Sequence, residues 1–328
     1  MAEAVIRDAI ELPCFDRAQR LLLNLGYLCL ALPPSGVFTK LTVMVLSHVR
    51  FQGASDIGDT FSSSRCPSLR LLSLEYAQGV SHLSICSESL LGIYLHILYG
   101  LQQLTVVSPM LRELRIWCFK SQPVADITAP VLEKLWWVAA YDPRSVQLGK
   151  LAQLRELATS FFAYTSYGLP EHQYNLGNAM LLQRYRKIAD LRITIDYPTS
   201  MVHIEYLMEA LTLPPVKNLH LFLVTYGHHI GSCVFYFLKI STSIRRLFLN
   251  IQEVIKEKTS CLPGCFCHGE KVWETEELFL NSLQELYICG FNGSDYDFAF
   301  VKRLLGWARM LKSVHIKFDP QETSRNCR

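Results

Sequence analysis

The sequence of 328 residues has neither a long apolar run nor a recognisable leader. Its most apolar segment, 21–32 (LLLNLGYLCLAL), is about 12 residues long and is interrupted by Asn24 and Gly26. A helix that crosses a bilayer needs about 20 apolar residues. The first residues, MAEAVIRDAIEL, include acidic side chains and no continuous apolar core, unlike a signal peptide. These absences predict a protein that is neither membrane-inserted nor secreted.

Long runs of one charge are also missing. The net charge of +3 is spread along the chain, and the longest basic cluster is 184–187 (RYRK). Such a cluster is too short and too isolated for a nucleic-acid surface. We therefore predict no nucleic-acid partner.

The motifs that carry catalysis are absent as well. The chain contains no G-x4-G-K-S/T, H-E-x-x-H, G-x-S-x-G or G-x-G-x-x-G. His228 and His229 are adjacent and would point to opposite sides of an extended segment, which favours an exposed loop over a metal or catalytic pair. We predict that the protein is not an enzyme, with no catalytic residues and no cofactor.

The eleven cysteines are an odd number, which argues against a disulfide framework and for reduced thiols in the cytoplasm or nucleus. One group is dense, because Cys261, Cys265, Cys267 and His268 form C-x3-C-x-C-H, and thiolates with imidazole can bind zinc. The spacing differs from the paired C-x2-C of common zinc modules. A loop of free thiols is therefore favoured, no metal is predicted, and zinc binding is the alternative.

The chain is instead rich in a recurring apolar triplet of the form L-x-x-L-x-L. A complete unit lies at 281–318, where two triplets are 28 positions apart: Leu283, Leu286, Ile288 and Leu311, Val314, Ile316. In an extended strand, the last two residues of each triplet point to the same face. Between the triplets we expect a helix capped by Asp295, with an inward stripe of Phe298, Val301, Leu305 and Ala308.

The same triplet recurs along the chain at regular intervals. First anchors at 41 and 69, 188 and 216, and 216 and 244 are 28 apart, and those at 69, 90, 111, 132 and 154 are 21 or 22 apart. This is a leucine-rich-repeat period, in which each coil buries its apolar edge against its neighbours. Between 69 and 137 a second series of triplets lies 10 or 11 positions after the first. Each coil there is expected to have a strand on both faces.

These patterns predict the fold class α/β, as a leucine-rich-repeat solenoid (horseshoe). The N-terminal half is expected to be β-rich with strands on both faces, and the C-terminal half to consist of strand–helix coils. Residues 1–160 would hold the coils of the shorter period, 161–280 the strand–helix coils with a cysteine-containing insertion, and 281–328 a terminal unit. Residues 161–185 are predicted to be a long connection. Ser200 and Ser232 are predicted to cap two helices, the second with Val234, Phe237 and Leu238 inward.

Residues between the buried anchors of a parallel strand row point to solvent. Alternation gives Ser73 and Glu75, Tyr94 and His96, Arg115 and Trp117, Trp136 and Val138, Arg192 and Thr194, His220 and Phe222, Phe248 and Asn250, and Tyr287 and Cys289. Aromatic and arginine side chains often dominate the affinity of protein–protein interfaces. The candidate protein-binding residues are Tyr94, Arg115, Trp117, Trp136, Arg192, His220 and Phe222. The predicted partner is therefore another protein.

Several of these segments together resemble a known family. They are Ala129-Pro130-x-Leu132-Glu133-x-Leu135, C-x3-C-x-C, Trp273, Leu283-x-x-Leu286-x-Ile288-x-Gly290-Phe291-x-Gly293, Phe300-Val301-Lys302-x-Leu304-Leu305, Ala308 and Leu311-Lys312. From about residue 18 onward, the chain resembles plant F-box and leucine-rich-repeat proteins with a C-terminal FBD region, and 281–328 is the FBD-like part.

This resemblance implies a substrate receptor of a cullin-RING ubiquitin ligase, which holds an adaptor through an N-terminal F-box and a target through its repeats. No F-box pattern precedes the first coil, because Leu12-Pro13 is followed by a strand-like run. The adaptor is expected to bind only if an F-box is supplied upstream. The sequence could be a truncated gene product, a fragment or a protein that uses its repeats alone. A stand-alone interaction module and an immune-receptor-like repeat fragment are the alternatives.

Overall fold

The apolar anchors of the sequence become the buried residues of parallel strands. The computed structural model describes residues 9–52, 57–118, 123–161, 171–185, 188–197, 211–241, 243–254, 272–291 and 293–318. They form two compact units, the first ending at Leu154 and the second beginning at Arg155. The structure is α/β, with parallel strands in large sheets and few helices, and each unit has a solenoid-like arrangement of successive coils. The finer division predicted at 160 and 280 stays a prediction.

Unit 1 contains a main row of parallel strands that follow the first triplet series. Its strands are β2 (Arg20–Asn24), β4 (Val43–Ser47), β6 (Leu71–Glu75), β8 (Gly92–His96), β10 (Glu113–Trp117) and β12 (Lys134–Val138). Each strand pairs in parallel with the next without a register shift. Leu72, Ile93, Leu114 and Leu135 therefore lie side by side, and all four are fully buried.

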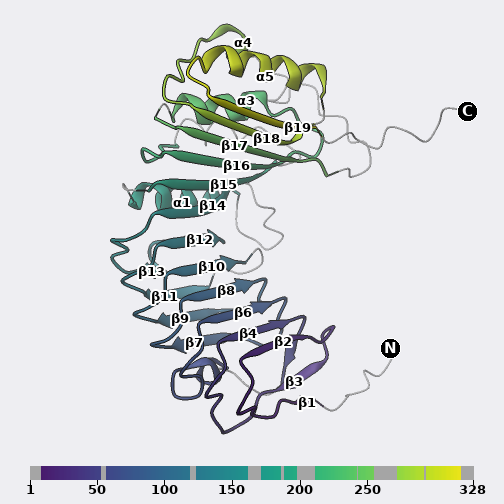
Figure 1. Ribbon diagram of the computed structural model, residues 1–328, viewed down its shortest axis with the longest axis vertical. Helices are drawn as coiled ribbons and strands as arrows, with labels where there is room; N and C mark the ends of the chain where they lie inside the picture. The colour runs from purple at the N-terminus through teal and green to yellow at the C-terminus, as the bar shows by residue number, and fades with distance from the viewer. Residues whose placement is uncertain are drawn as a thin grey trace, which may run out of the picture. The chain divides into compact units, whose positions relative to one another are not determined.

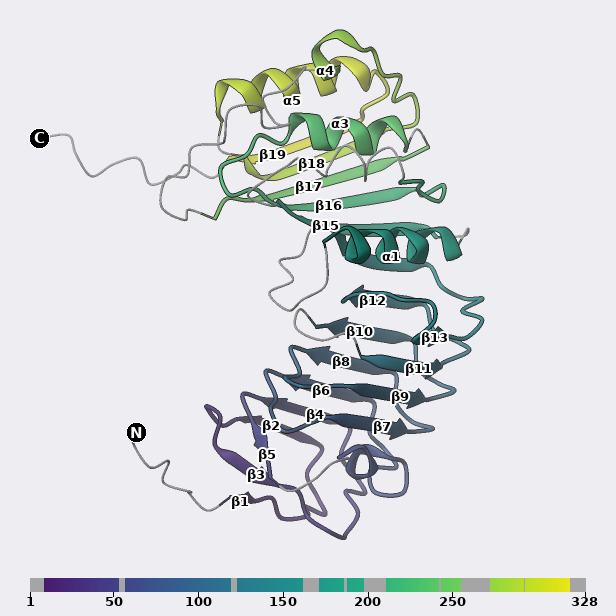
Figure 2. The same ribbon diagram turned by 180° about the vertical axis from the view of Figure 1, so that it is seen from behind.

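A second row of strands in unit 1 follows the second triplet series. It consists of β7 (His82–Cys86), β9 (Gln103–Val107), β11 (Val124–Thr128) and β13 (Val146–Leu148), which are also parallel. Buried and exposed residues alternate along β7 and β11, so each strand turns one side to the core and the other to solvent. Figures 1 and 2 show the two rows from opposite sides. The prediction of strands on both faces is confirmed for these coils.

The start of unit 1 adds a small parallel sheet to this plan. The sheet contains β1 (Ile10–Glu11), β3 (Cys29–Ala31) and β5 (Arg50–Phe51), and a short 3₁₀ helix, η1 (Gly58–Phe61), follows it. Strand β2 (Arg20–Asn24) precedes the first triplet anchor at 41 and pairs with β4, so the main strand row begins one strand before that anchor.

Unit 2 is built on a longer-period row of parallel strands. They are β14 (Glu156–Phe161), β15 (Asp190–Asp196), β16 (Asn218–Val224), β17 (Arg246–Gln252), β18 (Glu285–Phe291) and β19 (Ser313–Phe318). Its described helices are α1 (Glu171–Arg184), α3 (Gly231–Lys239), α4 (Val272–Thr275) and α5 (Asp295–Trp307). None of the described helices in either unit is long and apolar enough to cross a bilayer.

Helix α1 corrects the prediction that 161–185 is a long connection. The helix was missed because part of its inner face is polar. Tyr174 is buried with its hydroxyl 2.5 Å from the Ser160 hydroxyl, and the Asn178 side-chain amide donates to the Ser160 carbonyl oxygen at 2.8 Å. Burial raises the pKa of Tyr174 to about 12. A face held by hydrogen bonds leaves only a weak periodic apolar signal.

The helix caps also differ from the predictions. Ser232 lies inside α3, whose N-cap is Ile230, while Val234, Phe237 and Leu238 are buried as expected. In α5 the N-cap is Ser294, and its hydroxyl oxygen accepts the Asp297 N–H at 3.2 Å. The helix predicted after Ser200 lies outside the described residues.

The buried face of α5 is also rotated relative to the predicted stripe. Val301 and Ala308 are buried, but Phe298 and Leu305 are exposed. The side of α5 that faces the core instead includes Phe300, Leu304 and Trp307. The difference arises because the apolar residues of this helix are spread over more than one side, so that spacing alone permits two stripes.

Candidate functional site

In unit 1, the outward side chains of the main strand row form a site around Arg115. Parallel pairing places Tyr94 opposite Arg115 on one side and Trp136 opposite it on the other. The guanidinium carbon of Arg115 lies 4.8 Å from the centroid of the Tyr94 ring and 4.1 Å from that of Trp136. A cation between two aromatic faces is attracted by both ring quadrupoles. The three predicted residues are thus brought together.

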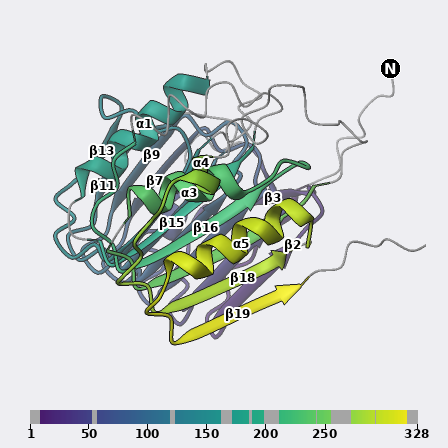
Figure 3. The same cartoon turned by 90° about the horizontal axis from the view of Figure 1, so that it is seen from above.

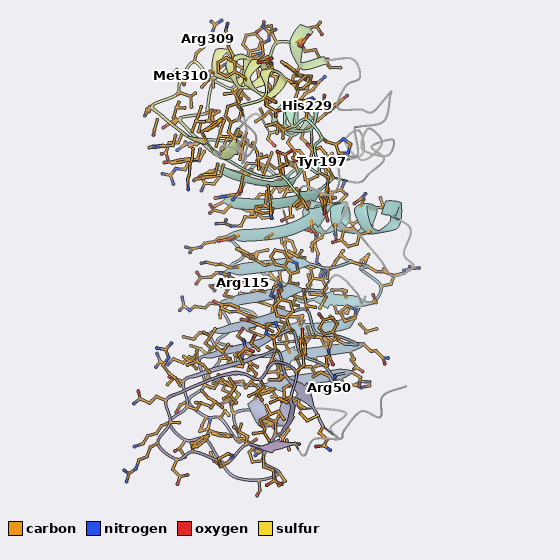
Figure 4. The ribbon with its side chains drawn as sticks, turned by 90° about the vertical axis from the view of Figure 1, so that its right-hand side faces the viewer. Arg50, Arg115, Tyr197, His229, Arg309 and Met310 are labelled. Atoms are coloured by element: carbon orange, nitrogen blue, oxygen red, sulfur yellow. The ribbon has the colours of Figure 1, made fainter. Side chains whose placement is uncertain are left out.

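A carboxylate completes this arrangement. The Arg115 Nε–H donates to Glu113 Oε1 at 2.6 Å, from two positions earlier on the same strand. Burial is the main cause that raises the pKa of the Tyr94 hydroxyl, and the Glu113 charge adds to it. Figure 4 marks Arg115 on its strand. The guanidinium is held before any partner arrives, so binding would lose little side-chain entropy.

A second row of rings lies at the carboxyl ends of the same strands. Tyr27, His48, Tyr76, His96 and Trp117 form a chain of contacts with centroid separations of 5.2, 4.6, 4.9 and 5.4 Å. The first three have positive φ angles of 70°, 50° and 52°. In this conformation the chain turns away from the strand direction, but the backbone N–H still donates to the next strand. The Tyr76 N–H, for example, donates to the His96 carbonyl at 2.7 Å. Trp117 belongs to this row and not to the pair of rings around Arg115.

Sequence reasoning missed three members of this row. Only His96 and Trp117 fall on strand positions that alternation assigns to solvent. Tyr27, His48 and Tyr76 fall just beyond the strands, where alternation no longer applies. A usable signal was present, because His48 and Tyr76 are 28 positions apart, like the anchors before them.

In unit 2, the outward residues form a stack of rings. Register places Arg192, His220, Phe248, Tyr287 and His315 across successive strands. The rings from His220 to His315 are 4.1, 4.7 and 4.8 Å apart and lie within 2°, 8° and 4° of parallel. Their faces contact one another, so it is mainly the ring edges and polar atoms that are available to a partner.

An ion pair lies at one end of this stack. The Nε–H of Arg192 donates to Glu156 Oε1 at 2.6 Å. Burial lowers the pKa of His220 to about 4, and the positive charge of Arg192 adds to the effect. Phe222 lies outside the stack, opposite Thr194 and Asn250 in the neighbouring outward row. His220 is therefore neutral at physiological pH.

This pKa predicts how the stability of the chain depends on pH. The pKa of an unfolded histidine is about 6.5, so the unfolded chain binds the His220 proton more tightly than the folded chain. The stabilisation is complete above about pH 6.5 and is lost as the pH falls towards 4. We expect the free energy of unfolding to fall more steeply over this range in the wild type than in His220→Phe, which keeps a ring against Phe248. Urea denaturation at a series of pH values measures this slope, and equal slopes would contradict the prediction.

The predicted residues thus form two separate candidate surfaces. Tyr94, Arg115, Trp117 and Trp136 belong to unit 1, whereas Arg192, His220 and Phe222 belong to unit 2. Two other residues that alternation assigned to solvent are buried, because Ser73 is 3% exposed and Val138 is 2% exposed. The Ser73 hydroxyl donates to Glu75 Oε1 at 2.8 Å, so this buried hydroxyl has a hydrogen-bond partner. Val138 belongs to a continuous buried run at 137–141, where strand alternation ends.

The adjacent histidines are not in an exposed loop, which corrects that prediction. His228 is buried and its ring stacks on Tyr197 at 6.0 Å, while His229 stacks on Tyr296 at 4.1 Å. His229 Nδ1 also lies 3.7 Å from Asp297 Oδ1. Figure 4 marks Tyr197 and His229. Each imidazole is thus packed against a separate ring, so the two do not converge on a common site.

Asp297 explains this arrangement. Its carboxylate accepts the Ile230 N–H at 3.3 Å, before α3, and the Ser294 hydroxyl at 2.8 Å, before α5. A carboxylate near two helix N-termini is favoured by both helix dipoles. The His229–Asp297–Ser294 group is therefore a structural tie between two coils. It lacks the geometry of a hydrolase triad, because the serine contacts the carboxylate and not the imidazole.

A groove of about 680 Å³ lies along the turns of unit 1. It is lined by Gln19, Thr39, Lys40, Thr42, Pro67, Ser68, Arg70, Glu88, Ser89, Leu91 and Met110. Its hydroxyls are already used to join coils, because Thr42 donates to the Gln19 carbonyl at 2.9 Å and Ser68 to the Thr39 carbonyl at 2.8 Å. The groove therefore has fewer donors for a ligand than its composition indicates.

The zinc alternative concerns a single segment of the chain. Cys261, Cys265, Cys267 and His268 lie outside the described residues. Within the described ranges, no three His, Cys, Asp or Glu side chains are grouped as metal ligands.

Comparison of the chain with protein-family models, with curated proteins and with solved structures found no match.

Proposed function

We propose that the chain is a leucine-rich-repeat solenoid of the horseshoe type that binds another protein through the outward side chains of its parallel strands. Strand pairing without slip along β6, β8, β10 and β12 in unit 1 supports this proposal, as does the same regular pairing between β15, β16 and β17 in unit 2. Repeats of this kind create extended binding surfaces, because equivalent positions line up from coil to coil. The proposed role is recognition and not catalysis.

The Tyr94–Arg115–Trp136 arrangement is the observation that carries the proposal. Trp, Tyr and Arg are the side chains most often found at the energetic centre of protein interfaces. Here they are adjacent, partly exposed and already in contact in the free chain. A partner that offers a carboxylate and an apolar side chain would meet a site that is already ordered.

We further propose that this recognition serves a cullin-RING ubiquitin ligase, with the chain as the substrate-binding part of an F-box-type receptor in the cytoplasm or nucleus. The support is the resemblance of the repeats and of 281–328 to plant F-box proteins with an FBD region. In this scheme the adaptor binds an F-box supplied upstream, and the strand faces described above bind the target.

Partner capture tests the surface directly. Tagged wild type, Arg115→Ala and Trp136→Ala are used to purify proteins from a plant extract, and the captured proteins are quantified by mass spectrometry. We expect the amount of specific target to fall by about tenfold or more in each variant, because hot-spot truncations weaken binding by about 2 kcal/mol or more. The ligase assignment predicts in addition that the captured targets accumulate when the proteasome is inhibited.

A matched control comes from the other strand row of unit 1. Asp126 is an exposed outward residue of β11, so Asp126→Ala changes a surface strand residue without touching the Arg115 site. We expect this variant to capture the same proteins as the wild type. Capture that is unchanged in both site variants, or equally reduced in the control, would contradict this surface.

A further inference from the structure

The last strand of unit 2 exposes the face that the preceding strands bury against the core. Register places Val314 and Ile316 of β19 beside Leu286 and Ile288 of β18. Leu286 and Ile288 are fully buried, but Val314 is 43% exposed and Ile316 is 42% exposed. In the described part of the chain, β19 pairs only with β18, so its other edge has no strand beside it. The core of the coil is therefore open on this side.

Other apolar residues of the same coil are exposed too. Phe318 ends the strand, Met310 lies in the turn before it, and Phe298 lies on α5; all three are exposed. Figure 3 shows α5 beside β18 and β19, and Figure 4 marks Arg309 and Met310 in the turn between α5 and β19. Exposed apolar residues grouped on one coil are typical of an interaction site.

The exposed charges of residues 293–318 are mostly positive. Lys302, Arg309, Lys312 and Lys317 are exposed, and none of them forms an ion pair with another described residue. Of the two acidic residues between 293 and 318, only Asp295 is exposed. The exposed side chains of residues 293–318 therefore carry a net positive charge, which favours an acidic partner.

Strand geometry then fixes the pattern of that partner. On β19, Val314 and Ile316 point to the core side, whereas His315 and Lys317 continue the outward rows of Tyr287 and Cys289. A segment added along the free edge would alternate between these two sides. Its inward residues would cover Val314 and Ile316, and its outward residues would lie across from His315 and Lys317, where carboxylates are favoured.

We propose that the free edge of β19 binds an extended segment of a partner protein in which apolar residues alternate with Asp or Glu. Backbone groups of the segment pair with the unpaired edge, its apolar side chains cover Val314 and Ile316, and its carboxylates approach Lys317. This site is distinct from the Arg115 surface and does not depend on it.

Two other occupants fit the surface less well. Residues 319–328 (DPQETSRNCR) contain no Val, Ile, Leu, Met or Phe, so they cannot supply the apolar cover. A second copy of β19 would bring a second set of lysines and histidines to the same edge. Like charges across a strand pair are destabilising, and lysine on an edge strand opposes self-pairing.

Fluorescence anisotropy with the full chain tests the proposal. The probe is a fluorescein-labelled peptide that alternates glutamate and valine over about nine residues, a length that spans one strand. A peptide of the same composition with its glutamates grouped at one end is the sequence control. We expect saturable binding of the alternating peptide and at least about tenfold weaker binding of the grouped peptide, because grouping removes the two-sided pattern.

Variants locate the site on β19. Ile316→Glu places a charge where the apolar side chains of the peptide would pack, and we expect at least about tenfold weaker binding. Lys317→Glu reverses the outward charge, and we expect about threefold weaker binding that grows at low salt. Val124→Glu, at an exposed valine of β11 in unit 1, is the matched control and should bind like the wild type. Because Lys317 is exposed, its variant keeps the test valid if Ile316→Glu fails to fold.

Three outcomes would overturn the proposal. They are equal binding of both peptides, unchanged binding by Ile316→Glu and Lys317→Glu, and self-association of the wild type that Ile316→Glu abolishes, which would make a second copy the occupant. Sedimentation velocity measures the last outcome. Target capture by the Arg115 and Trp136 variants is a separate measurement, so either surface can fail while the other stands.

Discussion

Replacement of Trp137 by alanine is expected to lower the free energy of unfolding of unit 1 by about 3–5 kcal/mol. Trp137 is the largest of the fully buried side chains of the chain's described part. Its indole Nε1–H donates to the Ala140 carbonyl at 3.3 Å, and its ring meets Tyr141 edge-on at 6.4 Å. The substitution leaves a cavity at the level of β12 and removes these contacts. Guanidinium denaturation followed by far-UV circular dichroism measures the loss.

The neighbouring tryptophan is the control for this prediction. Trp136 precedes Trp137 on the same strand but points outward, over Arg115. Trp136→Ala therefore removes a cation–π contact and little of the core, and we expect a loss of about 0.5–1 kcal/mol. The two variants should separate stability from binding, because Trp137→Ala unfolds more easily and Trp136→Ala binds less target. Equal losses of stability would contradict the assignment of the two faces.

Replacement of Gly290 by alanine is expected to destabilise unit 2 by at least about 2 kcal/mol. Gly290 has a φ angle of 75°, and an added Cβ would lie 1.9 Å from the Ile251 carbonyl oxygen. The pairing of β18 with β19 shifts register between Cys289 and Phe291, so the glycine forms a bulge. Both backbone strain and a clash with fixed backbone follow from the substitution. Thermal and urea denaturation of the purified variant measure it.

Gly306 is the control for Gly290 because it lies in the same coil. It belongs to α5, and an added Cβ there would have no atom within 4 Å. Gly306→Ala should raise the free energy of unfolding by about 0.4–1 kcal/mol, since alanine reduces the freedom of the unfolded chain and favours the helix. A destabilisation of similar size in both variants would show that the local geometry of Gly290 is not the cause.

The strand framework was predictable because each coil repeats one physical requirement. An inward pair two positions apart must be apolar, and the next coil must present a similar pair at the same height. Leu72, Ile93 and Leu114 satisfy this rule at equal spacing along the sequence and lie in register. The same rule assigned Trp137 to the core and Trp136 to the outward face, where the Trp136 ring contacts Arg115.

What lay beyond this rule was predicted less well. Helix α1 buries Tyr174 and Asn178 through hydrogen bonds, which an apolar pattern does not detect. Contacts between residues far apart in the chain, such as His229 with Tyr296, depend on how coils stack and not on local spacing. The horseshoe form and the ligase role stay predictions.

The uninterrupted register of unit 1 also bears on how such a chain could change over generations. Adjacent coils from β6 to β12 are equal in length and meet through equivalent residues. If a gene lost or duplicated the segment that encodes one coil, the coils on either side would still meet through equivalent residues. The recognition surface would then be one strand shorter or longer, and the packing of the core would be unchanged.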